Sequence, residues 1–191
     1  ALGRILGYLL YTVDYRLRLG GNKSTQLTIF TDSDWAGDQE DRKSQSGYVA
    51  QFGQSTVSWS SRKQKSVSRS SMEAEYIAMA DGLAEGIYLK QFLGELRIDC
   101  ETINMLGDNQ AAQAISNNPC NHSRAKHIDI GHHFVREWVQ DGRATTTYVQ
   151  SKDNPADIMT KGVPKPAHSK AVETIGIGPW GSVEKEVVQS R

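Results

Sequence analysis

A change of hydrophobic period near Ser70 constrains the fold of this chain more than any other feature. Before it, three strand-like segments follow one another: QLTIFTD at 26–32, SGYVAQFG at 46–53 and STVSWSSR at 55–62. Gln54 alone separates the last two, which predicts a hairpin and hence three consecutive antiparallel strands. QLTIFTD has apolar or β-branched residues on both faces, as expected of a strand buried between two layers.

After Ser70 the apolar residues recur at helical spacing. Ser70 or Ser71 suits the N-cap of the helical stretch 70–96, and Gly82 and Gly86 allow a bend or a break between two helices. The later elements are predicted as strands at 101–108 and 144–151 and as helices at 109–116, 127–140 and 155–161. A meander followed by alternating strands and helices predicts an α/β domain with a mixed sheet and helices on both faces.

The two ends of the chain are expected to lie outside this unit. Apolar residues at helical spacing in 2–13 predict an amphipathic helix, and the turn-prone GGNKS at 20–24 separates it from the first strand. Beyond about residue 176 the sequence has no clear period, so we expect a loose end.

Composition limits the class of protein. A length of 191 residues suits one main domain with additional segments, and a chain that begins at Ala1 is expected to be a segment of a longer protein. Lys and Arg number 22, as do Asp and Glu, so any nucleic-acid partner must be argued from local clusters. Two cysteines are too few for a disulfide framework, which favours a reducing compartment, and no apolar run approaches the roughly 18 residues of a membrane span.

Acidic residues stand at the ends of four predicted elements. They are Asp32 after LTIF, Glu75 near the start of the long helix, Asp108 after TINML and Asp157 in the first turn of the last helix. Because open sheets build their sites at strand ends, these acids are expected to converge at one edge. Four close carboxylates repel unless cations lie between them, and hard oxygen ligands suit Mg²⁺ or Mn²⁺. Taken singly, each acid is more simply explained as a turn, cap or solvated residue.

Two other metals fit the sequence less well. The EF-hand spacing for Ca²⁺ fails because Ala36 and Lys43 stand where that loop needs oxygen ligands. A zinc hypothesis would use Cys120, His122, His127, His132 and His133. On a helix, however, His127 and His132 point about 140° apart, a poor arrangement for one shared ion, so zinc is not expected.

A series of motifs runs along residues 25–162. They read TDSDWAGD, RKSQSGYVAQFG, SWSSRKQKSV, SSMEAEYIA, GDNQAAQAI, RAKHIDIGHHFVRE and NPADIMTK. Together they resemble the ribonuclease H domain of copia-type long-terminal-repeat retrotransposons. Residues 1–24 look like the segment that joins the reverse transcriptase to this domain, and 163–191 resemble the C-terminal helix and flexible tail of such polyproteins.

The resemblance implies a ribonuclease H-like α/β fold, with a mixed five-stranded sheet of three antiparallel strands followed by two parallel ones. It also implies an active site of four acids that binds two Mg²⁺ ions, with Mn²⁺ as a substitute. Matched motif by motif, the catalytic and metal-binding residues are Asp32, Glu75, Asp108 and Asp157, whereas Glu73, Asp34 and Asp38 fall outside the set. In this family one ion activates the water that attacks an RNA phosphate, and the other stabilises the departing 3′ oxygen.

The implied substrate is an RNA–DNA hybrid, recognised through its backbone geometry and 2′-hydroxyls. The candidate contacts are Arg62, Lys63, Lys65, Arg69, Ser70, Ser71, Asn109 and Gln110. The four basic residues are equally well explained as a solvated loop, and the serines as helix caps. The implied partner is the reverse transcriptase domain of the same polyprotein, in a cytoplasmic virus-like particle or in the nucleus.

Departures from the family leave rival functions open. Many cellular ribonucleases H have a histidine in the loop before the last helix, but residues 150–154 contain none, so slow turnover is expected. No protruding basic handle is evident between residues 108 and 127. A catalytically weak or inactive module that binds hybrid or supports the polymerase is the first alternative. A transposase-like DNA-strand transferase is the second, and the motifs SSMEAEYIA and NPADIMTK argue against it.

Overall fold

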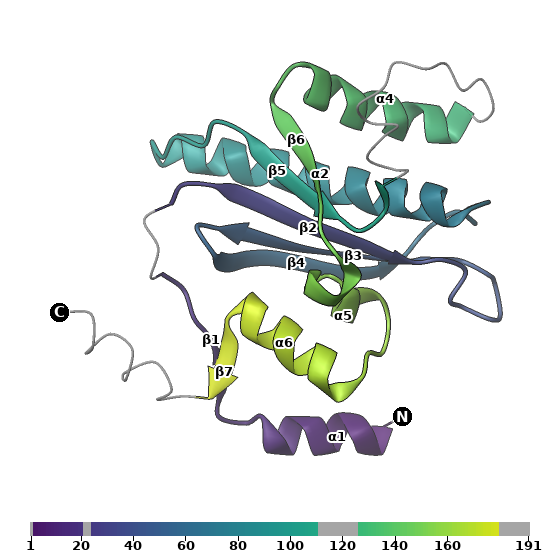
Figure 1. Cartoon of the computed structure of the whole chain (residues 1–191), viewed down its shortest axis with the longest axis vertical. Coiled ribbons are helices and arrows are strands. Elements are labelled where there is room, and N and C mark those ends of the chain that lie inside the picture. Colours follow the sequence, from purple (N-terminus) through teal and green to yellow (C-terminus); the bar gives the residue numbers. More distant parts are fainter. Residues whose placement is uncertain (1, 21–23, 111–125, 180–191) are drawn as a thin grey trace.

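The computed structural model describes residues 2–20, 24–110 and 126–179 (Figure 1). The elements are α1 (Leu2–Tyr11), β1 (Tyr15–Leu17), β2 (Leu27–Asp34), β3 (Gln45–Phe52), β4 (Ser55–Lys63), α2 (Ser71–Glu95), β5 (Ile103–Gly107), α4 (Lys126–Gln140), β6 (Ala144–Tyr148), the 3₁₀ turn η1 (Ser151–Asp153), α5 (Asp157–Thr160), α6 (Lys165–Ile175) and β7 (Ile177–Pro179). Among these elements, no helix is both long and apolar enough to cross a lipid bilayer.

The main sheet has five strands in the order β4-β3-β2-β5-β6. β2 and β4 each run antiparallel to β3, whereas β5 runs parallel to both β2 and β6. The β3–β4 turn has only two residues, Gly53 and Gln54, with φ of 55° and 75°, as a tight hairpin requires. The predicted mixed sheet of three antiparallel and two parallel strands is confirmed.

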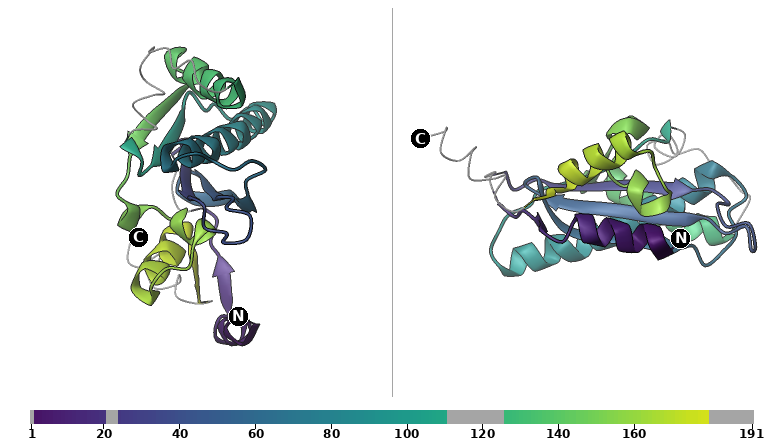
Figure 2. Two further views of the ribbon diagram at one scale, coloured as in Figure 1. Left: turned by 90° about the vertical axis from the view of Figure 1, so that its right-hand side faces the viewer. Right: turned by 90° about the horizontal axis from the view of Figure 1, so that it is seen from below.

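Helices cover both faces of this sheet (Figures 1 and 2). Alternation along β2 sends Leu27 and Ile29 into a core with α2, beside which α4 packs. Phe30, which has the opposite orientation, packs against a second core formed with α5 and α6. The end of β2 therefore lies between two helical layers, which brings side chains from both layers close to it.

The long helix α2 is continuous from Ser71 to Glu95, so the break considered at Gly82 and Gly86 is wrong. These glycines instead let the helix lie close to the sheet. A Cβ added at Gly82 would lie 2.7 Å from Cγ2 of Thr31, and one at Gly86 would lie 3.1 Å from Cγ2 of Ile103. The spacing of four residues puts both glycines on the face that contacts the strands.

Gly82→Ala is expected to destabilise the protein by about 1–3 kcal/mol, because the clash with Thr31 outweighs the gain in helix propensity. Gly94 is the matched control on the same helix, since an added Cβ there meets nothing within 4 Å. Gly94→Ala should be neutral or stabilise by up to about 1 kcal/mol. Urea unfolding curves of the three proteins give the comparison, and equal stabilisation by both substitutions would contradict the close packing at Gly82.

The two ends of the described chain pair with each other. Ile177–Pro179 forms β7, antiparallel to β1, so the loose end expected beyond residue 176 is wrong for these three residues. Tyr8 of α1 meets the ring of His168 of α6 edge-on, with 5.6 Å between ring centroids. α1 thus lies beside α6, at the opposite end of the molecule from α4 (Figures 1 and 2). The helix predicted at 109–116 falls almost entirely outside the described residues.

Candidate active site

Asp32 and Asp108 stand where two parallel strands separate. Phe30 and Leu106 are the last residues that β2 and β5 pair in register, and each acid follows two residues later. Since the two strands are parallel and paired in register, residues that follow the last pair by the same number of positions lie at the same edge of the sheet. Asp32 is only 1% exposed, and Asp108 is half-buried.

Glu75 reaches this edge from the second turn of α2. The hydroxyl of Ser70 accepts a hydrogen bond from the Glu73 N–H at 3.2 Å, and the Glu73 carboxylate accepts one from the Arg69 N–H at 2.8 Å. These two contacts resemble a capping box, although the Glu73 carboxylate bonds the residue before the N-cap, and they fix the start of the helix and occupy Glu73. Glu75 is buried, and its Oε1 accepts a hydrogen bond from the Ser33 N–H at 3.3 Å.

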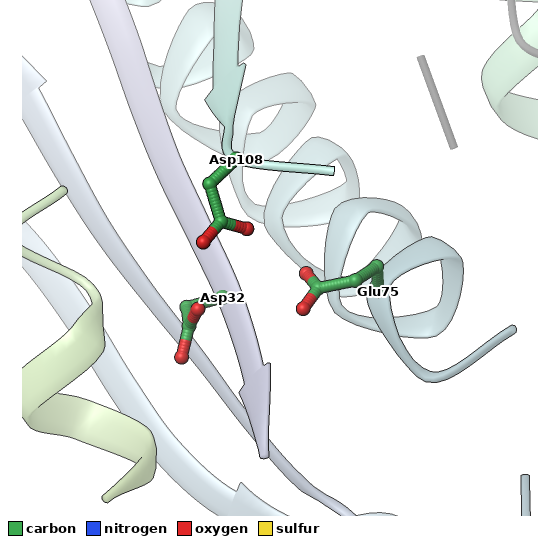
Figure 3. Close-up of side chains that lie close together, drawn as sticks. All are labelled: Asp32, Glu75 and Asp108. Atoms are coloured by element: carbon green, nitrogen blue, oxygen red, sulfur yellow. The ribbon is translucent and has the colours of Figure 1, made fainter. Parts of the chain in front are cut away.

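The three carboxylates face one another (Figure 3). One oxygen from each of Asp32, Glu75 and Asp108 lies within 4.8 Å of the others. We call this group the acidic triad. Among the side chains that the structure describes, those of residues 2–20, 24–110 and 133–179, it is the sole group of three or more His, Cys, Asp or Glu residues arranged to hold a metal ion.

The electrostatics of the triad favour a cation. Burial is the main cause that raises the pKa of Asp32 to about 7, and the charges of Asp157 and Asp108 add to it, against the opposing contacts of Thr160 and Lys161. Burial also raises the pKa of Glu75 to about 8, followed by the charges of Asp32 and Asp108. Without a bound cation the triad retains protons near neutral pH, whereas a divalent ion would favour its ionised form.

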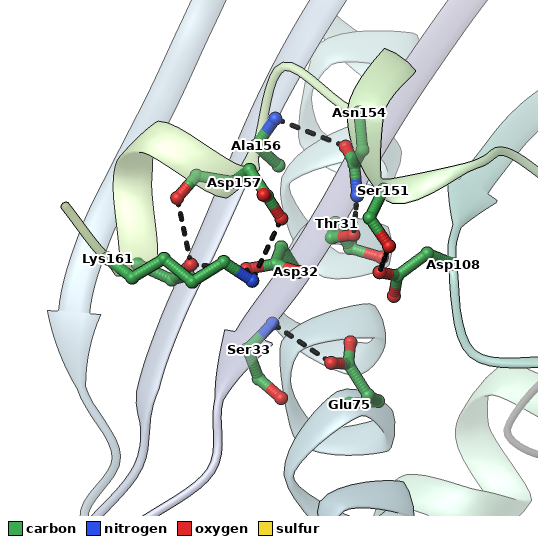
Figure 4. A network of polar contacts seen from close by, with 11 residues as sticks. Thr31, Asp32, Ser33, Glu75, Asp108, Ser151, Asn154, Ala156, Asp157 and Lys161 are labelled. Atoms are coloured by element: carbon green, nitrogen blue, oxygen red, sulfur yellow. Dashed lines mark hydrogen bonds and ion pairs between the residues drawn. The ribbon is translucent and has the colours of Figure 1, made fainter. Parts of the chain in front are cut away.

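Asp157 lies beside the triad and is linked to it through Lys161 (Figure 4). The ammonium of Lys161 lies 3.0 Å from Oδ1 of Asp157 and 3.5 Å from Oδ2 of Asp32. Burial lowers the pKa of Lys161, but the charges of Asp32 and Asp157 outweigh burial and raise it, so the ammonium stays protonated. The hydroxyl of Thr160 donates to the same Oδ2 of Asp32.

The segment before α5 is anchored to β2 by a buried side chain. Asn154 donates from Nδ2 to the carbonyl of Thr31 at 2.9 Å and accepts from the Ala156 N–H at 3.1 Å. Gly47, the partner of Asp32 across the β2–β3 pair, allows α5 to approach, because a Cβ there would lie 2.6 Å from Cβ of Met159. The backbone that carries Asp157 and Lys161 is thereby fixed relative to Asp32.

A further hydroxyl holds the third acid of the triad. Ser151, the first residue of η1, donates to Oδ2 of Asp108 at 2.5 Å. Sequence reasoning missed this serine, together with Thr160 and Lys161. The last two lie within the motif NPADIMTK, and Lys161 stands four residues after Asp157, the spacing at which opposite charges meet on a helix.

The predicted substrate contacts differ in exposure. Arg62, Lys65 and Arg69 are exposed, as is Ser71 at the start of α2. Asn109 and Gln110 directly follow Asp108, the first half-buried and the second exposed. Ser70 is occupied as the N-cap of α2.

Lys63 differs from the other basic candidates. Its ammonium pairs with Asp38 and lies 3.4 Å from Asp41, in the loop between β2 and β3. A contact with a phosphate would require these ion pairs to break.

Most of the group considered for zinc falls outside the described residues. Cys120 and His122 lie among residues 111–125, and the side chains of His127 and His132 are also not described. His133 is exposed on α4.

Relatives of this chain occur in plant transposons. No family model matches it. It is 39% identical over 173 residues, 91% of its length, to the retrovirus-related Pol polyprotein from transposon TNT 1-94 of Nicotiana tabacum. It is also 39% identical over 178 residues, 93% of its length, to that from transposon RE1 of Arabidopsis thaliana. The chain spans only 13% and 12% of these two polyproteins.

Solved structures identify the fold. RNase H1 from Halobacterium salinarum aligns with a TM-score of 0.51 over 71% of this chain and 94% of its own, at 16% identity. The N-terminal RNase H domain of a Mycobacterium tuberculosis protein aligns with a TM-score of 0.52 over 79% of this chain and 99% of its own, also at 16% identity. The chain is therefore homologous to one segment of the retrovirus-related Pol polyproteins of plant transposons, and this segment has the ribonuclease H fold.

Proposed function

We propose that this chain is the ribonuclease H part of a retrotransposon reverse transcriptase and hydrolyses the RNA strand of RNA–DNA hybrids with Mg²⁺. The observation that carries the proposal is the acidic triad at the point where β2 and β5 separate in a ribonuclease H fold. Buried carboxylates with raised pKa values in such a position suit a metal-dependent hydrolase better than a structural role.

The residues present fit divalent metal ions. Asp32, Glu75 and Asp108 offer carboxylate oxygens, the ligands that Mg²⁺ and Mn²⁺ prefer, and Asp157 offers another beside them. Two such ions would supply the charge that activates water and stabilises the departing oxygen. Asp32 belongs to the triad and is also linked to Asp157 through Lys161, so it is the acid that would help to hold both ions. Thr160 and Ser151 hold Asp32 and Asp108 in orientation.

The proposed substrate and partner follow from homology. The foamy viral protease-reverse transcriptase, solved in complex with an RNA/DNA hybrid, aligns with a TM-score of 0.51 over 81% of this chain and 21% of its own, at 9% identity. The exposed Arg62, Lys65 and Arg69 would contact the hybrid backbone by charge. We place the chain beside the reverse transcriptase domain of its polyprotein, in a cytoplasmic virus-like particle or the nucleus.

Cleavage of a defined hybrid tests this function. The purified chain is incubated with an RNA–DNA hybrid labelled on the RNA strand, in Mg²⁺ and separately in excess EDTA. Single-stranded RNA, duplex DNA and duplex RNA of the same sequence are the matched substrates. We expect RNA cleavage in the hybrid alone and only with Mg²⁺. Equal cleavage of single-stranded RNA would contradict the substrate, and equal cleavage in EDTA would contradict the metal.

A catalytically weak module that binds hybrid is the second candidate. The observation in its favour is the segment 150–154 before α5, which contains no histidine. This candidate predicts that the chain binds the labelled hybrid in a filter or polarisation assay while cutting it no faster than a variant without the triad.

A further inference from the structure

Lys161 places a positive charge where a cation would otherwise be expected. Its ammonium lies between carboxylates from different elements, Asp32 of β2 and Asp157 of α5 (Figure 4). Asp32 belongs to the acidic triad, whereas Asp157 stands outside it. The four acids thus define two neighbouring cation positions: one within the triad, and one between Asp32 and Asp157.

The partners of Lys161 are fixed, whereas Lys161 is able to move. The side chains of Asp32 and Asp157 are 1% and 17% exposed, but that of Lys161 is 38% exposed. A lysine is a point charge on a flexible four-carbon stem, so its ammonium exchanges these carboxylates for water by rotations of its own side chain. Asp32 has no such freedom, because it is also held by the hydroxyl of Thr160.

The charges at this position favour replacement of the ammonium by a divalent ion. A single ammonium balances one of the negative charges that gather here, while a divalent ion balances two and accepts several oxygens at once. An ammonium and a divalent ion within contact distance of the same two carboxylates repel each other strongly, so the two do not share the position.

We propose that Lys161 is a tethered cation that occupies the position between Asp32 and Asp157 in the metal-free protein and withdraws when a divalent ion binds there. The inference rests on the metal-dependent function proposed above. It assigns Lys161 as a positioning residue that keeps Asp32 and Asp157 together before metal binds. An ion in the triad binds with Lys161 in place, whereas an ion at the second position must displace it, so the two ions bind with unequal affinity.

Titration with Mn²⁺ alone, without substrate, tests the inference on the full chain. Isothermal calorimetry and the electron paramagnetic resonance signal of free Mn²⁺ give the number of ions bound and their affinities. The variants are Lys161→Met and Lys161→Gln, which remove the charge, and Lys161→Arg, which retains it. Lys170→Met is the matched control, because Lys170 pairs with Asp153 on the same side of the sheet but contacts none of the four acids.

We expect Lys161→Met and Lys161→Gln to tighten the weaker Mn²⁺ binding event by about tenfold and the tighter event by less. Lys161→Arg should bind as the wild type does, and Lys170→Met should change neither event. A lysine with a merely structural role would weaken metal binding when removed, which is the opposite direction.

Two results overturn the inference alone and leave the proposed function standing, and a third overturns both. If the uncharged variants bind the second ion no more tightly than the wild type, Lys161 does not compete with metal, while the metal-dependent function stands. The inference also fails, with the function intact, if Lys170→Met tightens that event equally. If neither the wild type nor the variants bind any Mn²⁺, both the inference and the proposed metal site fail.

Discussion

Asp32→Asn is expected to reduce cleavage of an RNA–DNA hybrid by about 10³-fold or more. Asp32 is the acid common to the triad and to the contact with Asp157 through Lys161, so its loss removes a ligand from both proposed cation positions. Asn is nearly the same size and still accepts the hydrogen bond of Thr160, so the fold should persist. Asp108→Asn should have a comparable effect. Initial rates with a hybrid labelled on its RNA strand, at saturating Mg²⁺, provide the measurement.

Asp34→Asn is the matched control for this loss. Asp34 lies two residues further along β2, and its carboxylate lies against the turn at Gly37, outside the triad. Its substitution should leave the cleavage rate within about twofold, as expected for a site away from the reacting groups. Hybrid affinity measured in EDTA should be similar in all four proteins. If the wild type cuts the hybrid no faster than Asp32→Asn does, the proposed enzymatic function is wrong, whatever the affinity for hybrid.

The sequence predicts the sheet well because its signals are local. The apolar and β-branched run at 26–32 and the short turn at Gln54 each act over a few residues and predict the antiparallel strands. The parallel pairing of the later strands is implied by the resemblance to a family. The position of Asp32 directly after the run LTIFT is equally local, although β2 continues for two residues beyond it, to Asp34. Its convergence with Glu75 and Asp108 depends on packing between distant elements. Their positions at the ends of predicted elements make this convergence plausible, and the resemblance to a family selects these acids from their neighbours.

The parts that were wrong or missed depend on long-range contacts. Gly82 looks like a helix breaker in isolation, yet Thr31 on the distant strand β2 explains why no larger residue fits there. β7 has only three residues and is stabilised by pairing with β1 at the other end of the chain, which no local period reveals. Lys161 looks like a solvated helix charge until α5 is placed against β2, because only then does Asp32 come within reach.

Asp32→Asn should also make the metal-free protein more stable than the wild type, by a margin that grows as pH rises, in contrast to the loss of cleavage. Burial and neighbouring charges raise the pKa of Asp32 to about 7 and that of Glu75 to about 8, from ordinary values of 3.8 and 4.5. Between the ordinary and the raised pKa values, the folded state holds protons that the unfolded state has lost. The free energy of unfolding of the wild type therefore falls as pH rises. Above about pH 8 the fall is complete. Asn at position 32 removes one of these ionisations and one charge that opposes ionisation of Glu75.

The gain is expected to be on the order of 3 kcal/mol near pH 8.5 in EDTA and close to zero near pH 4. Urea unfolding at several pH values, with and without excess Mg²⁺, measures it. Mg²⁺ should reverse the order at about pH 8.5, because a bound cation stabilises the wild-type carboxylates and has less to bind in the variant. Asp38→Asn provides the control, since pairing with Lys63 lowers the pKa of Asp38, so its loss should give no gain as pH rises. If Asp32→Asn and Asp38→Asn respond to pH in the same way, ionising the buried triad does not have the electrostatic cost described above, and the reason for a cation at this edge of the sheet disappears.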